Sequence, residues 1–353
     1  MKRLFKAAVS ILAVASVLTG CSGGNTATFG AGASKSDGVS AASASPAQIT
    51  MRVAYMPNMS SASALITGIK MGYFKEQGID VQTVKFAKGP DEIAAMGSGN
   101  IDVSQIGTGA HVLCAKGQAK IFAYDCSSIN DEVLANKDKG ITKIADLKGK
   151  TIAATLGTSS EQILELALES KGMTKKDVNI VQMDASAAAT AMISGKVDAC
   201  ATWSPSTITI KDKMGDKALL LANNTTFADK TPSPSSFICT NGYYSAHQDA
   251  LVRFTRALLK AQDYRAVHLK EAADWVAELV QQDKTTIEKT TGDSEWLLAK
   301  DIYSKAKEGT FKTIYEAQQR NFVSSGSLAK EVDVGTYFSP DIMIKAYEAN
   351  QAK

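Results

Sequence analysis

The sequence predicts an α/β protein with two domains on mostly parallel sheets, followed by a helical C-terminal part. Strand-like and helix-like segments alternate between about residues 50 and 240, a pattern typical of such sheets. About 300 residues follow position 47, more than one hydrophobic core usually organises. After Tyr243 the apolar spacing becomes helical almost throughout.

Predicted strands and helices alternate between about residues 50 and 203. We predict strands at Thr50–Tyr55, Asp80–Phe86, Val103–Ile106, Thr151–Ala154, Val178–Gln182 and Ala199–Trp203. We predict helices at Ala62–Met71, Pro90–Ser98, Ala110–Lys116, Ser159–Ser170 and Ala185–Ser194. In the C-terminal part, Ser245 with Gln248 three residues later predicts a capping box at the start of a helix.

Two segments resemble each other and indicate two related lobes. Residues 89–103 and 184–199 each hold an alanine-rich predicted helix that ends near a Ser-Gly pair, and an aspartate then opens the next strand. The glycines fit the C-terminal caps of helices. Two such lobes would direct strand ends and helix starts toward a common crevice.

The first 21 residues have the layout of a secretory signal peptide. Three cationic residues precede an apolar run over residues 7–18, and small residues then lead to Cys21. The run is shorter than the roughly 20 residues that a membrane-spanning helix needs. Residues 18–21 resemble the bacterial lipobox, so we expect a diacylated Cys21 that anchors the protein outside the cytoplasm at the cell membrane. The alternative is ordinary cleavage beside an incidental cysteine.

Residues 22–47 are almost all small or polar, and this composition predicts a flexible tether. The whole chain carries a formal net charge of +3, and removal of the three cations of the signal peptide leaves it formally neutral. A neutral chain argues against nucleic acid as a partner.

Four stretches, in this order, resemble one branch of the periplasmic-type solute-binding proteins, whose members bind taurine, other sulfonates, nitrate or pyrimidine precursors of thiamine. They are GIKMGYFKEQGIDVQ (68–82), GPDEIAAMGSGNIDVSQIGTGA (89–110), ADLKGKTIAATLGTSSE (145–161) and GKVDACATWSPS (195–206). The resemblance covers about residues 50–240 and implies a type II clamshell, in which a small molecule binds between two α/β lobes that a hinge closes.

The same resemblance implies the domain boundaries and the partners. Lobe one would span residues 48–130 plus 240–353, and lobe two residues 131–239. Crossing strands would lie near Ile121–Ser127 and Phe237–Asn241. The implied partners are a small ligand and the membrane permease of an ABC importer, and we expect a monomer without a cofactor.

Two turns that follow predicted strands and open predicted helices are candidates for the binding site. Residues 107–110 and 157–160 combine glycine with hydroxyl side chains. Free N–H groups and the positive end of a helix attract an anion at such places, and hydroxyls add donors. We therefore predict that these residues contact an organic anion: Thr108, Gly109, Thr158, Ser159 and Ser160. Thr158 with Glu161 also forms a capping box, so Thr158 alternatively only caps its helix.

Further candidates lie at other predicted strand ends. Trp203 follows a strand where the resembling family carries a pocket aromatic, and its alternative is a place in the core. Asn58 and Phe86 could add a polar and an aromatic contact. Lysines 85 and 88 and aspartates 125 and 184 also lie near strand ends, but solvated lysines are the default and we assign no ligand contact to these four.

The sequence favours binding over catalysis. The motifs GxSxG and HExxH and a Walker-type loop are absent from the sequence, which argues against the commonest hydrolase classes. Cys114, Cys126, Cys200 and Cys239 lie in apolar surroundings without metal-ligand spacing, so we expect buried small side chains and no metal site. A rival hypothesis on the same fold is a binder of an uncharged or aromatic molecule such as a pyrimidine precursor, which should surround its ligand with several rings.

Overall fold

The computed structural model describes residues 47–227 and 232–352. The predicted signal peptide, Cys21 and all but the last residue of the tether lie outside these residues. No helix within the described part of the chain is long and apolar enough to cross a membrane.

The described strands form two sheets. The six-stranded sheet has the order β11-β4-β10-β3-β1-β2 and consists of β1 (Ile49–Tyr55), β2 (Ile79–Lys85), β3 (Val103–Ile106), β4 (Lys120–Ser128), β10 (Pro234–Cys239) and β11 (Ser294–Glu295). The five-stranded sheet has the order β7-β6-β8-β5-β9 and consists of β5 (Asp131–Asn136), β6 (Thr151–Ala154), β7 (Asn179–Gln182), β8 (Ala199–Trp203) and β9 (Ala218–Asn223). We call each sheet with the helices packed on it lobe one and lobe two, respectively.

The helices fall into two groups along the chain. Those before β10 are α1 (Met59–Lys70), α2 (Tyr73–Glu76), α3 (Gly89–Gly97), α4 (His111–Ala115), α5 (Ser159–Glu169), α6 (Ala185–Ile193) and α7 (Ser206–Met214). Those after β10 are α8 (Asn241–Ala246), α9 (Gln248–Val267), α10 (Leu269–Val280), α11 (Lys284–Glu288), α12 (Ala299–Lys307), α13 (Thr310–Ser324) and α14 (Asp341–Gln351). The 3₁₀ turn η1 (Thr108–Ala110) precedes α4.

The two sheets share one topology. In lobe one β1 pairs in parallel with β2 and β3, and β10 then pairs antiparallel with both β3 and β4. In lobe two β6 pairs in parallel with β7 and β8, and β5 then pairs antiparallel with both β8 and β9. In each sheet the antiparallel strand is the one that arrives directly from the other sheet along the chain. This common order agrees with the repeat seen in the sequence.

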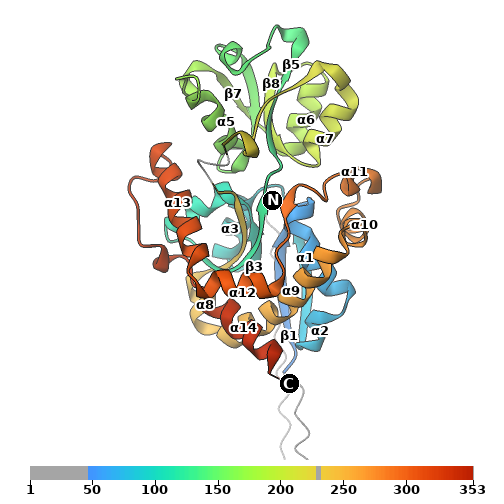
Figure 1. Cartoon of the computed structure of the whole chain (residues 1–353), viewed down its shortest axis with the longest axis vertical. Helices are drawn as coiled ribbons and strands as arrows, with labels where there is room; N and C mark the ends of the chain where they lie inside the picture. Colours follow the sequence, from blue (N-terminus) through green and yellow to red (C-terminus); the bar gives the residue numbers. More distant parts are fainter. Residues whose placement is uncertain (1–46, 228–231, 353) are drawn as a thin grey trace, which may run out of the picture. The chain divides into compact units, whose positions relative to one another are not determined.

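Lobe two buries both faces of its sheet. Val133 packs with α5 in one apolar cluster, whereas the next residue, Leu134, packs with α6 and α7 in another. Alternate residues of a strand point to opposite faces, so β5 serves both clusters. Figure 1 shows α5 on one side of this sheet and α6 and α7 on the other.

Lobe one has a single larger core that the C-terminal helices complete. Phe254 of α9 contacts three other aromatic rings, with centroid separations of 5.0 Å to Phe74, 6.2 Å to Phe122 and 5.7 Å to Phe237. Helix α14 packs on α9 and α12. The helical part that the sequence predicted after Tyr243 therefore belongs to the core of lobe one.

The structure confirms the predicted α/β class, and β3, β6 and β8 have the predicted bounds. The capping box at Ser245 is wrong, because Ser245 lies inside α8 and donates to the carbonyl of Asn241, while α9 begins after His247. Strands β5 and β9 were not predicted. Since β10 pairs with β3 and β4, we propose that lobe two ends before residue 232, earlier than the predicted 239.

Candidate functional site

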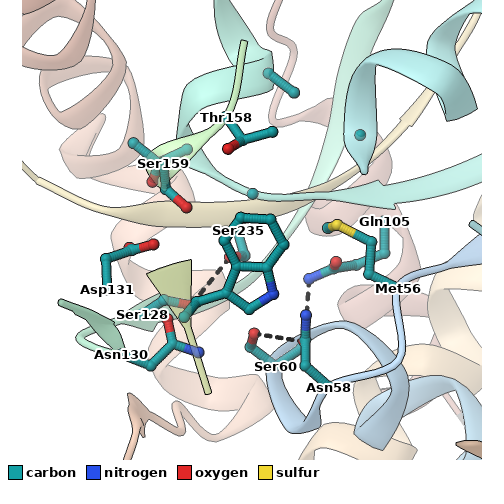
Figure 2. A pocket seen from close by; sticks show the side chains of 15 residues that line it. Met56, Asn58, Ser60, Gln105, Ser128, Asn130, Asp131, Thr158, Ser159 and Ser235 are labelled. Carbon is teal, nitrogen blue, oxygen red and sulfur yellow. Dashed lines mark hydrogen bonds between the residues drawn. The ribbon is translucent and has the colours of Figure 1, made fainter. Parts of the chain in front are cut away.

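A pocket lies between the two lobes. Fifteen residues line it, and both sheets contribute to them (Figure 2): Met56, Asn58, Ser60, Gly89, Gln105, Gly107, Thr108, Ala110, Ser128, Asn130, Asp131, Thr158, Ser159, Trp203 and Ser235. Most of the side chains are hydroxyls, amides or small groups. This lining holds one carboxylate and neither lysine nor arginine.

The turn between β1 and α1 forms part of the wall of lobe one. Asn58 caps α1, and its Oδ1 accepts from the backbone N–H of Ser61 at 2.8 Å and from the hydroxyl of Ser60 at 3.0 Å. The Ser61 hydroxyl accepts from the backbone N–H of Met56 at 2.9 Å, which fixes the end of β1. The first turn of α1 contains no acidic residue.

The turn between β6 and α5 is built in the same way in lobe two. Thr158 caps α5, and its Oγ1 accepts from the backbone N–H of Ser160 at 3.2 Å and donates to the carbonyl of Thr155 at 2.6 Å. The Ser160 hydroxyl accepts from the backbone N–H of Thr155 at 3.0 Å and donates to the carbonyl of Ala201 at 2.6 Å. The predicted cap at Thr158 is confirmed, but the Glu161 carboxylate accepts from the backbone N–H of Gly157 rather than from that of Thr158.

The two lobes touch beside the pocket. A Cβ placed on Gly109 would lie 2.1 Å from the backbone carbon of Thr158 and 2.5 Å from the backbone nitrogen of Ser159. Only glycine therefore allows η1 to approach the start of α5 this closely. The contact lies beside the pocket, because Thr108 and Thr158 both line it.

Asp131 is the carboxylate of the pocket and lies at the start of β5, opposite Trp203 of β8 in the register. Its side chain is buried, and Oδ2 accepts from Asn224 Nδ2 at 3.2 Å. Oδ1 is also buried and meets no donor at hydrogen-bonding geometry among the described residues. Burial raises the pKa of Asp131 to about 6, and the nearby hydroxyl of Ser159 and the amide of Asn224 partly offset that rise.

Gln105 of β3 occupies the opposite side of the pocket from Asp131 (Figure 2). Its Nε2 donates to Asp125 Oδ2 at 2.9 Å and to the carbonyl of Ser60 at 3.1 Å. Asp125 forms a fully buried ion pair of 2.7 Å with Arg265 of α9. Because both partners of Nε2 are acceptors, the orientation of the amide is fixed, and Oε1 remains buried without a donor.

The structure brings together most of the predicted contact residues. Five of the eight line the pocket: Asn58, Thr108, Thr158, Ser159 and Trp203. Gly109 lines a neighbouring groove, and Phe86 and Ser160 line neither this groove nor the pocket. The Thr108 hydroxyl donates to the carbonyl of Pro234 at 2.8 Å. Trp203 is only 7% exposed, so it is both a core and a pocket residue.

The remaining candidates lie away from the pocket. Lys85 is exposed, Lys88 pairs with Asp91 at 3.5 Å, and Asp184 caps α6. The four cysteines of the described chain are buried, as the sequence predicted, and none is bonded to another.

Sequence reasoning missed the two unsatisfied acceptors of the pocket. Gln105 is an amide within a strand whose four residues are all buried, and such a residue must find polar partners. Asp131 follows a predicted crossing strand, in residues 128–132, for which no strand or helix was predicted. The amide in the buried strand was a usable signal, whereas Asp131 gave none.

Comparisons with known proteins agree with this geometry. The sequence profile of the family described as "NMT1/THI5 like" matches residues 60–272. This chain belongs to that family. A binding protein of Brucella abortus is 31% identical over 293 residues, which cover 83% of this chain and 91% of that protein. An aliphatic sulfonates-binding protein of Bacillus subtilis is 26% identical over 304 residues, which cover 83% and 87%.

Solved structures share the fold of this family member. The alkanesulfonate-binding protein from Xanthomonas axonopodis pv. citri, bound to MOPS, superposes with a TM-score of 0.65 at 20% identity and covers 83% of this chain and 99% of its own. The predicted periplasmic-binding-protein fold is thereby confirmed. The chain is a solute-binding protein, and its relatives in sequence include proteins named for aliphatic sulfonates and for taurine.

The fold alone does not decide between binding and catalysis. A desulfurization enzyme also superposes, with a TM-score of 0.62 at 15% identity, and covers 86% of this chain and 99% of its own. The relatives in sequence are named as binding proteins. The residues that line this pocket include neither histidine nor cysteine.

Proposed function

We propose that this chain is the substrate-binding component of an ABC importer and that a small organic acid, such as a sulfonate, binds in the pocket between its lobes. The observation that carries the proposal is a pocket lined by the helix starts of both lobes, beside the close contact of Gly109 with Thr158. Helix starts offer free N–H groups to an anion, and the surrounding hydroxyls and amides add neutral donors. A relative in sequence is named for aliphatic sulfonates, and a neighbour in structure holds MOPS, which carries a sulfonate group.

Aromatic ligands have less support. A pocket for a pyrimidine should stack several rings on its ligand, but Trp203 is the single aromatic residue of this lining. Tyr55, Phe86 and Phe237 do not line it. The Ser128 and Ser235 hydroxyls bond to each other at 3.2 Å. The relatives in sequence are named as binding proteins, which supports binding rather than catalysis.

Thermal unfolding of the mature chain tests this function. A ligand that binds only the folded state at a hundred times its Kd stabilises by about 2.7 kcal/mol, which should raise the Tm by about 4–8 °C for a protein of this size. We expect such a rise with at least one of taurine, ethanesulfonate, MOPS, nitrate or β-alanine. A rise with an aminopyrimidine and with none of these acids would contradict the proposed ligand class.

The lipid anchor at Cys21 is part of the same proposal. Two acyl chains hold a protein stably at a membrane, where a permease could receive the ligand. In cells fed radioactive palmitate, the wild-type chain should carry label and remain in the membrane fraction. Label that persists in Cys21→Ala would refute the anchor without affecting the pocket.

A further inference from the structure

We propose that the ligand is a zwitterion, with a protonated amino group that donates to Asp131 and a second N–H or O–H group that donates to Gln105. This inference rests on the proposed function, because it specifies the ligand class of the same pocket. The two side chains lie on opposite sides of the pocket, one in each lobe (Figure 2). A ligand with both donors would therefore join the lobes.

Asp131 supplies the first acceptor. Its side chain is 1% exposed, and Oδ2 already accepts from Asn224 while Oδ1 has no donor at bonding geometry. A buried carboxylate oxygen without a partner is costly, and native proteins keep few of them. The neighbouring Glu132 of β5 is paired with Lys211 of α7 at 2.6 Å, and the residues that line the pocket include no lysine or arginine. A bound ligand would therefore supply the positive donor.

Gln105 supplies the second acceptor from lobe one. Its amide nitrogen is fully used by Asp125 and by the carbonyl of Ser60, so Oε1 alone is left for the pocket. Asp125 accepts from the Arg265 guanidinium at 2.7 Å and from Gln105 Nε2 at 2.9 Å, so an amide turned over would set its oxygen against a carboxylate oxygen. This buried network therefore presents an acceptor, not a donor, to the ligand.

The two helix starts indicate which end of the ligand lies in which lobe. The start of α5 lies beside Asp131 through Ser159 and carries Glu161 in its first turn. The start of α1 has no acid in its first turn and is capped by the neutral Asn58. Glu161 is paired with Lys175 at 2.6 Å and lines the neighbouring groove, so the carboxylate that repels an acidic group at the first site is Asp131. Free N–H groups attract an acidic group at the second site. The acidic end therefore belongs beside α1 and the amino end beside Asp131.

Matched probes that differ only in the amino group test the ligand class. Taurine and isethionate share a sulfonate and differ in an ammonium against a hydroxyl, and β-alanine and 3-hydroxypropionate form the same pair for a carboxylate. By calorimetry on the mature chain, we expect the amino member of at least one pair to bind about ten- to a hundredfold more tightly than its hydroxyl partner. Asp131→Asn should remove this difference, whereas Asp138→Asn, which removes an exposed charge from the same lobe, should keep it.

A second measurement needs no ligand. In Asp131→Asn the side-chain oxygen can keep the bond from Asn224, and the new amide can face the pocket without a buried charge. At pH 8 we expect the ligand-free variant to melt about 2–6 °C above the wild type, and at pH 5 we expect the two to melt together. A carboxylate that served only the fold would give the opposite sign at pH 8.

The outcomes separate the two proposals. Hydroxyl members that bind as tightly as amino members, or an Asp131→Asn variant that binds taurine as the wild type does, overturn the zwitterion and leave the binding protein intact. If none of the probes binds, the proposed class of acids fails. The melting temperature of Asp131→Asn then decides alone whether this carboxylate is reserved for a ligand.

Discussion

The β1–α1 turn of lobe one and the β6–α5 turn of lobe two stand at equivalent places in two sheets of the same strand order. Both turns end in a serine, Ser61 or Ser160, whose hydroxyl bonds the backbone N–H five residues earlier. They differ in charge, because the buried Asp131 accompanies only the second turn, where Glu161 is paired with Lys175. Both lobes thus share the same hydrogen bond from a backbone N–H to a serine hydroxyl, but the charges around it differ. The two ends of the pocket therefore suit groups of opposite charge.

The largest effect should come from the contact between the lobes. Gly109→Ala places a methyl carbon 2.1 Å from the backbone carbon of Thr158, far inside van der Waals contact, so the lobes cannot close as they do here. We expect at least about a hundredfold loss of affinity for the best acid, since closure supplies most contacts of such a ligand. Calorimetry measures this loss, and circular dichroism checks the fold.

Gly97→Ala is the matched control for this change, because a Cβ on Gly97 meets no atom within 4 Å. It should bind as the wild type does. A Gly109→Ala variant that retained full affinity would show that ligand binding does not require this contact.

The two serines provide a direct test of how similar the turns are. Ser160→Ala removes a donor and an acceptor and leaves the N–H of Thr155 and the carbonyl of Ala201 unpaired, so we expect a loss of about 2–4 kcal/mol in the free energy of unfolding. Ser61→Ala removes the bond to Met56 and should cost about 1–2 kcal/mol. Urea denaturation compares them, and equal losses would refute the ranking.

The pH dependence of stability should belong to lobe two. Burial raises the pKa of Asp131 to about 6, so the folded state favours the protonated carboxyl more than the unfolded state does. Its contribution is therefore present in acid and is lost as the pH rises from about 4 to about 6. Relative to Asp131→Asn, the wild type should lose about 2 kcal/mol of unfolding free energy across this range.

Two other carboxylates, Glu132 and Asp293, interact electrostatically with Asp131 and also affect the pH dependence of stability. Glu132 is paired with Lys211, and Asp293 also has a pKa raised to about 6 by burial. Urea melts of Asp131→Asn and of Asp131→Asn with Asp293→Asn, from pH 4 to pH 8, separate the contributions. A wild-type profile parallel to that of Asp131→Asn would refute the assignment.

The smallest effect is expected from Glu161→Gln. If the acidic end of the ligand lies beside α1, removal of an acid from the first turn of α5 should change the affinity for taurine by less than about twofold. An increase of about tenfold would place the acidic end at α5 instead. The stability should fall by less than about 1 kcal/mol, because the lost ion pair with Lys175 is partly exposed.

The sequence predicted much of the fold because periodicity reports burial. The parallel strands β3, β6 and β8 are short apolar runs between turn signals, and they were found at their observed bounds. β5 was not predicted because it starts with two acidic residues, which are more typical of a loop. Asp131 is polar because it lines the pocket, and Glu132 because it forms an ion pair with Lys211. A strand that opens into a binding site carries residues chosen for the ligand and so breaks the pattern.

The site was predicted only in outline for a related reason. A serine after a strand can face a ligand or the backbone of a distant strand, and Ser160 faces the carbonyl of Ala201, 41 residues away. Likewise, the acceptor role of Gln105 depends on Asp125 and on Arg265, which is 140 residues from Asp125. Local sequence holds no information on such partners, because the fold brings them together.

The strand order has a consequence for how the chain folds during synthesis, which starts at the N-terminus. In each sheet the antiparallel strand follows a strand of the other sheet along the chain, since β5 follows β4 and β10 follows β9. However, β5 is the first strand of lobe two, whereas β10 comes after β1–β4 of lobe one. Lobe two holds all its strands once Asn223 has emerged. Lobe one, although synthesised first, remains divided between β3 and β4 until β10 arrives, and its core lacks α9 and α14 still longer. The lobe made second is therefore the first that can complete its sheet. Until β10 arrives, β3 keeps one edge unpaired and β4 is not joined to the strands before it, which is when a holding chaperone would be of most use.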